Sequence, residues 1–161
     1  MRASLPVIST PLFDTHFHID PEANNSALFE RARCAGVSHL LVAATTLADA
    51  VMIQQAVAVE AGVVTTVGVH PHEAKSVTDG FDVFRGLAGH PNVVAIGEIG
   101  LDYHYDFSPR EKQRQVFAGF LELAVELRLP AIVHCREAFE DCLEIMGDTL
   151  PAGHPFEVHS F

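Results

Sequence analysis

The sequence predicts an α/β fold: a TIM (β/α)8-type barrel with parallel strands, incomplete, with about six β units present. Two observations predict it. Short β-branched runs alternate with stretches of helical spacing, and several of these runs end in a histidine or a glutamate. Because strands separated by helices are joined by right-handed crossovers, the strands of such a chain lie parallel. We expect residues 1–161 to form one domain.

Strands and helices are expected to alternate along the whole chain. The run 37–44 is continuously apolar, which is typical of a strand buried on both faces. Gly36 and Gly62 end the first two helices, since glycine favours the C′ position. The expected strands cover residues 11–18, 37–44, 63–69, 93–97, 131–134 and 156–160. The expected helices, with their caps, cover residues 24–35, 46–62, 81–88, 108–127 and 137–146.

Two helices carry clear start signals. Thr46 is a suitable N-cap, with Asp49 three positions later. Ser108 as N-cap, Pro109 at the first helical position and Glu111 as a capping-box residue begin another helix. The apolar residues that follow fall on one helical face: Phe117, Phe120, Leu121, Ala124 and Leu127.

An open, doubly wound sheet is the competing architecture. No glycine-rich phosphate loop follows the first strand, which disfavours the dinucleotide-binding form of that fold. A complete barrel needs about 250 residues and about eight strand–helix units. The sixth expected strand lies next to Phe161, the last residue, so we expect the last barrel strands to be missing.

The composition limits the class of protein. The chain has 21 acidic residues against 10 lysines and arginines, a net charge of −11, which disfavours general attraction to nucleic acid. Bound divalent cations would reverse that field locally. The three cysteines show no CxxC spacing, and we find neither a signal peptide nor an apolar run of membrane-spanning length. We expect a cytoplasmic protein without a membrane partner.

Three polar residues recur in the first expected strand. Asp14, His16 and His18 lie two positions apart, so a regular strand places them on one face. A buried strand leaves such groups unsatisfied unless they bind something, and paired imidazoles suit a metal ion. The alternative is a solvated edge strand that carries these histidines by chance.

Later strands end in the same kinds of side chain. Glu98 directly follows the fourth strand, His134 ends the fifth, and His159 lies at the end of the sixth. The carboxyl ends of the strands face the active site in a parallel barrel. Glu98 alone could equally be an exposed loop residue, but residues of this kind on four strands indicate a metal site.

Three further residues are candidates for contact with a substrate. His70 and His72 follow the third strand in the segment GVHPH, where a polar loop is as good an interpretation as substrate binding. Arg136 shares a face with His134, where its guanidinium could hold a phosphate oxygen or pair with a nearby glutamate.

The donor set also predicts the cofactors. Nitrogen and oxygen donors without thiolate fit Mg²⁺, Mn²⁺ or Zn²⁺. A bridging carboxylate at Glu98 suggests two divalent ions roughly 3.5–4 Å apart, as in many phosphodiesterases. Such a pair lowers the pKa of a bound water and stabilises the charge that develops on phosphoryl oxygens.

Five segments, in order along the chain, resemble the TatD family of metal-dependent deoxyribonucleases: FDTHFHID, VGVHPHEA, IGEIGLDYH, LPAIVHCREA and VHSF. GEIGLDYH is the most diagnostic of them. The resemblance implies that His16 and His18 bind one ion and that Glu98 bridges to a second. It implies that His134 and His159 hold the second ion.

The resemblance also implies an activity. His70 matches a position near the substrate phosphate, so Glu98 and His70 are the expected catalytic residues, and His72 and Arg136 are expected to bind substrate. The implied reaction is hydrolysis of DNA by a two-metal-activated water, with 3′-5′ exonuclease action on single-stranded ends, in DNA repair or turnover.

One departure from the family pattern matters. The family's barrel continues past the sixth strand, and a later aspartate completes the first metal site, whereas this sequence ends at Phe161. We therefore expect weak binding of the first ion and low activity of the chain alone. An incomplete barrel also has open edge strands, which favour self-association.

Other functions fit parts of the pattern. Amidohydrolases and lactonases share the barrel and the paired histidines, but they commonly bridge their ions with a modified lysine. Here the bridging position is Glu98, and no lysine lies between Lys75 and Lys112. An ester hydrolase acting on aminoacyl-tRNA, and a non-catalytic scaffold that retains the histidines, remain alternatives.

Overall fold

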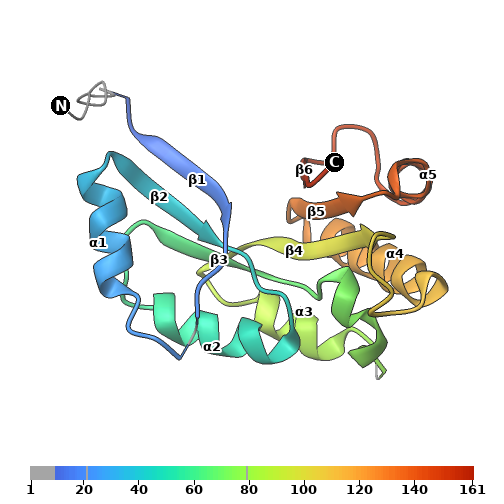
Figure 1. Cartoon of the computed structure of the whole chain (residues 1–161), viewed down its shortest axis with the longest axis horizontal. Helices are drawn as coiled ribbons and strands as arrows, with labels where there is room; N and C mark the ends of the chain where they lie inside the picture. Colours follow the sequence, from blue (N-terminus) through green and yellow to red (C-terminus); the bar gives the residue numbers. More distant parts are fainter. Residues whose placement is uncertain (1–9, 21, 79) are drawn as a thin grey trace.

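Six parallel strands form one sheet, and their order in space, β1-β2-β3-β4-β5-β6, is their order along the chain (Figure 1). The computed structural model describes residues 10–20, 22–78 and 80–161. The strands are β1 Leu12–Phe17, β2 Val37–Val42, β3 Val63–Val67, β4 Val93–Asp102, β5 Ala131–Arg136 and β6 Phe156–His159. The helices are α1 Ser26–Cys34, α2 Leu47–Val57, the 3₁₀ helix η1 Pro71–Ser76, α3 Asp82–Ala88, α4 Arg110–Leu127 and α5 Phe139–Thr149.

The sheet is the wall of a partial barrel, as the sequence predicts. A doubly wound sheet reverses its strand order at one point, and the six described strands show no reversal. In Figure 1 the helices lie outside the curve of the sheet, with β1 and β6 at its two ends. Side chains of these edge strands meet inside the curve, where Thr15 Oγ1 donates a 3.1 Å hydrogen bond to Glu157 Oε1.

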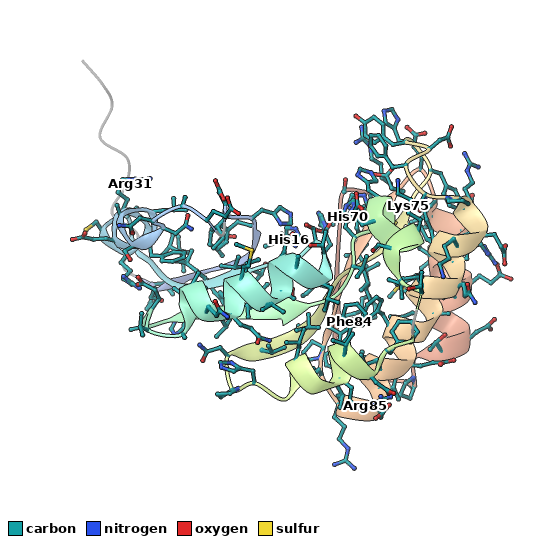
Figure 2. All side chains as sticks on the ribbon, turned by 90° about the horizontal axis from the view of Figure 1, so that it is seen from below. His16, Arg31, His70, Lys75, Phe84 and Arg85 are labelled. Atoms are coloured by element: carbon teal, nitrogen blue, oxygen red, sulfur yellow. The ribbon has the colours of Figure 1, made fainter. Side chains whose placement is uncertain are left out.

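The hydrophobic core lies between the sheet and the helices. Phe120 of α4 packs edge-on against Phe81 and Phe84, with ring centroids 4.8 and 4.9 Å away. Figure 2 shows Phe84 pointing into the molecule and its neighbour Arg85 pointing away from it. Most of the apolar face predicted for α4 is buried in this layer, and only Leu127 is partly exposed. In the described part of the chain, no helix is long and apolar enough to cross a membrane.

The structure corrects several of the expected helix boundaries, and α5, expected to end at Met146, continues to Thr149. Thr46 caps α2 as predicted, accepting a 3.0 Å hydrogen bond from the backbone N–H of Asp49, but the helix ends at Val57 and not at Gly62. Ser108 does not cap α4, because its hydroxyl donates to the backbone carbonyl of His72. Pro109 takes the N-cap position instead. The 3₁₀ helix η1 was not predicted at all.

Strand β4 continues five residues beyond the predicted end at Gly97. Pairing with β5 extends it, since Gly100, Leu101 and Asp102 lie in register with His134, Cys135 and Arg136. Two glycines allow a close approach of the strands. A Cβ at Gly97 would lie 2.6 Å from Cβ of Ile132, and a Cβ at Gly100, where φ is +136°, would overlap the carbonyl oxygen of His134.

We predict that Gly100→Ala destabilises the fold, because the added methyl group cannot fit unless β4 and β5 separate. The free energy of unfolding, measured by urea titration, should fall by at least about 1 kcal/mol. The matched control is Gly147→Ala in α5, where nothing lies within 4 Å of the new Cβ and the free energy of unfolding should rise by about 0.5–1 kcal/mol. Equal stability of Gly100→Ala and the unaltered chain would contradict this close approach.

Candidate metal centre

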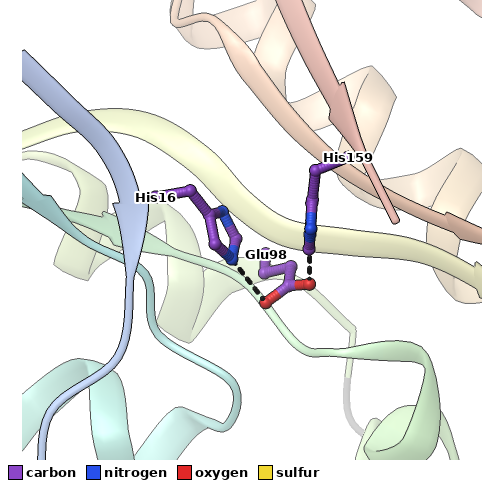
Figure 3. A group of neighbouring side chains, drawn as sticks. All are labelled: His16, Glu98 and His159. Carbon is purple, nitrogen blue, oxygen red and sulfur yellow. Dashed lines mark hydrogen bonds and ion pairs between the residues drawn. The ribbon is translucent and has the colours of Figure 1, made fainter. Parts of the chain in front are cut away.

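The Glu98 carboxylate of β4 is 1% exposed and lies at the centre of a ring of imidazoles. The five histidines come from β1, from the segments that follow β1 and β3, and from the ends of β5 and β6. Their nearest nitrogens lie at these distances from a Glu98 oxygen: His16 Nε2 3.4 Å, His18 Nε2 3.3 Å, His70 Nε2 3.6 Å, His134 Nδ1 3.0 Å and His159 Nε2 2.6 Å. Figure 3 shows His16 and His159 on opposite sides of Glu98, each facing a different carboxylate oxygen.

The ring of imidazoles keeps Glu98 ionised. Burial by itself raises the pKa of this carboxyl, but the close imidazoles of His134, His159, His16 and His18 outweigh it and hold the pKa far below its ordinary value. Glu98 in turn raises the pKa of His18. The centre therefore contains a permanent negative charge that needs positive partners.

Two of the imidazoles are oriented so that a lone pair faces Glu98. The Nδ1 of His18 lies 3.0 Å from the carbonyl oxygen of Ala43, which only accepts, so Nδ1 carries a proton. In the neutral ring, the Nε2 lone pair then points at Glu98. The Nε2 of His134 lies 3.0 Å from Asp102 Oδ2, so Nε2 donates there and Nδ1 faces Glu98 in the same way. Lone pairs converging on a carboxylate repel one another unless protons or a metal cation lie between them.

His70 is a largely buried imidazole that is neutral at physiological pH. The pKa of His70 is lowered to about 3, chiefly by burial. Repulsion from the neighbouring His134 and His72 contributes to this lowering, whereas attraction to Glu98 opposes it. Its Nδ1 accepts a 3.2 Å hydrogen bond from the backbone N–H of His72. The proton therefore resides on Nε2, which faces Glu98 and lies 3.3 Å from His134 Nδ1.

Asp102, which was not predicted from the sequence, forms hydrogen bonds with two of the histidines on the side away from Glu98. The residue is fully buried, and its Oδ2 accepts from His134 at 3.0 Å and from His72 at 2.9 Å. Its Oδ1 accepts from the backbone N–H groups of His104 and Tyr105. Burial raises the pKa of this carboxyl, but these hydrogen bonds lower it below its ordinary value. Asp102 is therefore an anion that fixes two imidazoles in place.

Period-two alternation could have revealed Asp102 in the sequence. Glu98, Gly100 and Asp102 lie two positions apart, so one face of a continuing strand carries both carboxylates. The prediction ended the strand at Gly97, so Asp102 lay outside it and was not considered. Gln113 of α4 fixes its backbone, accepting from the Asp102 N–H at 2.8 Å and donating to its carbonyl at 3.1 Å.

The donors present fit a divalent cation. Glu98 Oε2 and His16 Nδ1 are buried without a hydrogen-bond partner among the described residues. Two groups hold potential ligand atoms within 4.8 Å of one another, His16–Glu98–His159 and His70–Glu98–His134. Glu98 belongs to both. The predicted residues thus surround one carboxylate, while their partition between two ions stays a prediction.

The other candidate residues lie at the edge of this ring. His72 contacts Asp102 and not Glu98. The guanidinium of Arg136 lies 5.1 Å from the ring centroid of Tyr105. Within the described ranges Arg136 forms no ion pair, so the considered pairing with a neighbouring glutamate does not occur.

Asp14 does not share the face of His16 and His18, contrary to the expectation of a regular strand. Between Asp14 and Phe17 β1 advances three residues while β2 advances two, so β1 contains one extra residue. Thr15, inside this irregular stretch, points into the curve of the sheet and lines a cavity there. The Asp14 carboxylate accepts from the backbone N–H of His16 instead.

A carboxylate encircled by imidazoles at the carboxyl edge of a parallel barrel sheet is the architecture of the barrel-type metal-dependent hydrolases. Comparison with known proteins identifies the family within this class. The family model of TatD related DNases matches residues 13–161. The chain therefore belongs to the TatD family, which confirms the resemblance of its motifs.

Curated relatives agree with this assignment. A protein of Bacillus subtilis strain 168 named uncharacterized metal-dependent hydrolase YabD is 35% identical over 141 residues, covering 85% of this chain and 55% of the relative. A 3′-5′ ssDNA/RNA exonuclease TatD of a Rahnella species is 41% identical over 137 residues, covering 82% of this chain and 51% of the relative. The chain spans about half the length of these relatives.

Solved structures share the fold. The TatD homologue YJJV of Escherichia coli K12 aligns with a TM-score of 0.75 at 25% identity, over 86% of this chain and 56% of that one. A TatD family hydrolase of Entamoeba histolytica aligns with a TM-score of 0.76 over 94% of this chain and 60% of that one. At 24% identity, this second likeness supports the fold alone. Both confirm the incomplete barrel that the sequence predicts.

We predict that Asp102→Asn weakens metal binding by about 10–100-fold, because an amide no longer holds the Nε2 protons of His134 and His72 with a full negative charge. Calorimetric titration of the metal-stripped chain with Mn²⁺ measures this. Asp106→Asn, an exposed carboxylate in the same segment, is the matched control and should leave the affinity unchanged. Equal affinities in the two variants would exclude the supporting role of Asp102.

Proposed function

We propose that the chain is a two-metal deoxyribonuclease that hydrolyses phosphodiester bonds at single-stranded DNA ends, in the 3′-5′ direction. The observation that carries the proposal is the buried, ionised Glu98 with imidazoles on both of its oxygens. Family membership supports a phosphodiester substrate. The direction of digestion and the single-stranded preference rest on the names of relatives, which also include RNA among the substrates.

We propose the following ligands for the two ions, with Mg²⁺, Mn²⁺ and Zn²⁺ all compatible with the donors. His16 and His18 bind one ion, His134 and His159 bind the other, and the Glu98 carboxylate is shared. Two groups of converging donor atoms have only Glu98 in common, which supports a division into two sites, although these groups pair His16 with His159 and His134 with His70. Bound ions of this kind supply a hydroxide nucleophile and stabilise charge on the phosphoryl oxygens.

The protein's own residues would bind and orient the DNA. The Nε2–H of neutral His70 points into the centre, so it can donate a hydrogen bond to a phosphate oxygen without adding a positive charge. Arg136 forms no ion pair within the described residues, which leaves its guanidinium available for a second phosphate oxygen. His72 forms a hydrogen bond with Asp102, and this contact holds the segment after β3 that also carries His70.

Loss of the shared carboxylate should abolish the activity. In Glu98→Gln we expect release of 3′-terminal nucleotides from a single-stranded oligonucleotide to fall more than roughly a hundredfold, because both ions lose a ligand. Oligonucleotides labelled at either end, with RNA and duplex DNA in parallel, report direction and substrate preference. Glu140→Gln, an exposed glutamate at the start of α5, is the matched control.

Counting the Mn²⁺ ions bound by the same proteins separates metal binding from catalysis. One tight and one weak site in the unaltered chain would agree with the expected weak binding of the ion at His16 and His18. Two tight sites would contradict that expectation. A metal-loaded chain without hydrolysis would contradict the proposed activity of this chain. Hydrolysis that persists in Glu98→Gln would place the activity elsewhere.

We also propose that the chain self-associates through its edge strands. β1 and β6 each have one edge without a neighbouring strand among the described residues, and Phe13 and Phe156 on them are 51% and 55% exposed. Light scattering should therefore give a mass above that of one chain. Leu12→Lys on β1 should restore the mass of a monomer, whereas a monodisperse unaltered monomer would contradict the proposal.

A cytoplasmic location and a role in DNA repair or turnover are further parts of the proposal. Cys34, Cys135 and Cys142 are all free thiols, which suits a reducing compartment. The proposed removal of nucleotides from single-stranded ends is a step that repair and turnover both need.

A further inference from the structure

The segment between β4 and α4 carries two exposed aromatic rings that the proposed reaction does not use. Tyr105 and Phe107 stack on each other with centroids 5.2 Å apart and planes 22° from parallel. They are 40% and 53% exposed, so they add little to the core. Because each ring covers one face of the other, the stacked pair offers its outer faces and edges to a ligand, and we call this pair the aromatic platform.

The aromatic platform borders the candidate metal centre. His72 sets the edge or face of its ring against both members, with centroids 5.4 Å from Tyr105 and 4.8 Å from Phe107. The other side of the same imidazole donates to Asp102, which also holds His134. The His72 side chain therefore lies between the platform and the residues that contact Glu98.

Two cations accompany the platform, although Asp106 between its two rings is an exposed carboxylate and the chain as a whole carries a net charge of −11. The guanidinium of Arg136 lies over the Tyr105 ring, 5.1 Å from its centroid, without an ion pair in the described ranges. The Lys75 ammonium donates a 2.9 Å hydrogen bond to the backbone carbonyl of Phe107. The neighbouring Glu137 is occupied by His104, at 2.7 Å. In Figure 2 the labelled Lys75 lies on the same side of the molecule as His70.

We propose that the aromatic platform is a nucleobase-stacking subsite, with Arg136 binding the adjacent backbone phosphate. Flat rings beside a cation are what single-stranded nucleic acid requires, because every base has a π-face and every linkage a negative charge. Stacking tolerates any sequence and needs an unpaired base, so the platform favours single strands over the interior of a duplex. The inference rests on the proposed function, since it takes nucleic acid as the ligand.

Binding without turnover tests the subsite. Short fluorescein-labelled oligothymidylate with phosphorothioate linkages, which resist hydrolysis, is compared by anisotropy with an abasic chain of the same length and linkage, both in Mn²⁺. Tyr105→Leu and Phe107→Leu should each raise the Kd for oligothymidylate by roughly tenfold, the size of one lost stacking contact, and leave the abasic Kd unchanged. Arg136→Gln should raise both Kd values by the same factor.

Two further variants serve as controls. Tyr105→Phe keeps the ring and should bind oligothymidylate as the unaltered chain does. Leu143→Ala removes an equally exposed apolar side chain from α5 and should change neither Kd. Retained thermal unfolding midpoints show that each variant is folded.

Equal affinity of the unaltered chain for the two oligonucleotides would overturn the inference. So would aromatic variants that change neither Kd or that raise both equally. These outcomes are separate from those for the proposed function. A chain that prefers bases but never cleaves DNA contradicts the proposed hydrolysis and supports the platform, while one that cleaves without base preference overturns the platform alone.

Discussion

The buried negative charge of Glu98 is the constraint on which the rest of the site depends. An ionised carboxylate that is almost fully removed from water is costly unless cations or hydrogen-bond donors surround it. Its imidazole partners come from β1, β5, β6 and the segment after β3, and none of these is a neighbour of Glu98 in the sequence. Only a sheet with its strands in chain order and its carboxyl ends together delivers all of them to one point.

Hydrogen bonds to the imidazoles and to the Asp102 backbone link this centre to the core. Asp102 orients His134 and His72, and Gln113 holds the Asp102 backbone from the first half of α4. Because α4 packs through Phe117 and Phe120 against the sheet, the geometry of the imidazoles depends on ordinary apolar packing. The close approach of β4 to β5 at Gly100 belongs to the same arrangement, since it places His134 beside Glu98.

Charge is distributed unevenly over the chain, which makes an acidic protein compatible with the proposed nucleic-acid substrate. The overall excess of 21 acidic over 10 basic residues would repel DNA at long range. The candidate centre concentrates imidazoles around one carboxylate, and Arg136 stands beside it without an ion pair in the part of the chain that is described. Cations held at Glu98 would complete a local field of opposite sign.

The sequence by itself determined the alternation of strands and helices, the parallel barrel and the identity of the residues around Glu98, because these depend on local periodicity and on which end of a strand faces the site. Tertiary structure decided the rest. Strand pairing extended β4 to Asp102, and an extra residue in β1 turned Asp14 away from His16. The packing of Tyr105 and Phe107 against His72 likewise depends on tertiary structure, because it joins the segment after β4 to η1, which is far away in the sequence. Register between strands is set by contacts across the sheet, so alternation along β4 could suggest Asp102 but could not fix its pairing with β5.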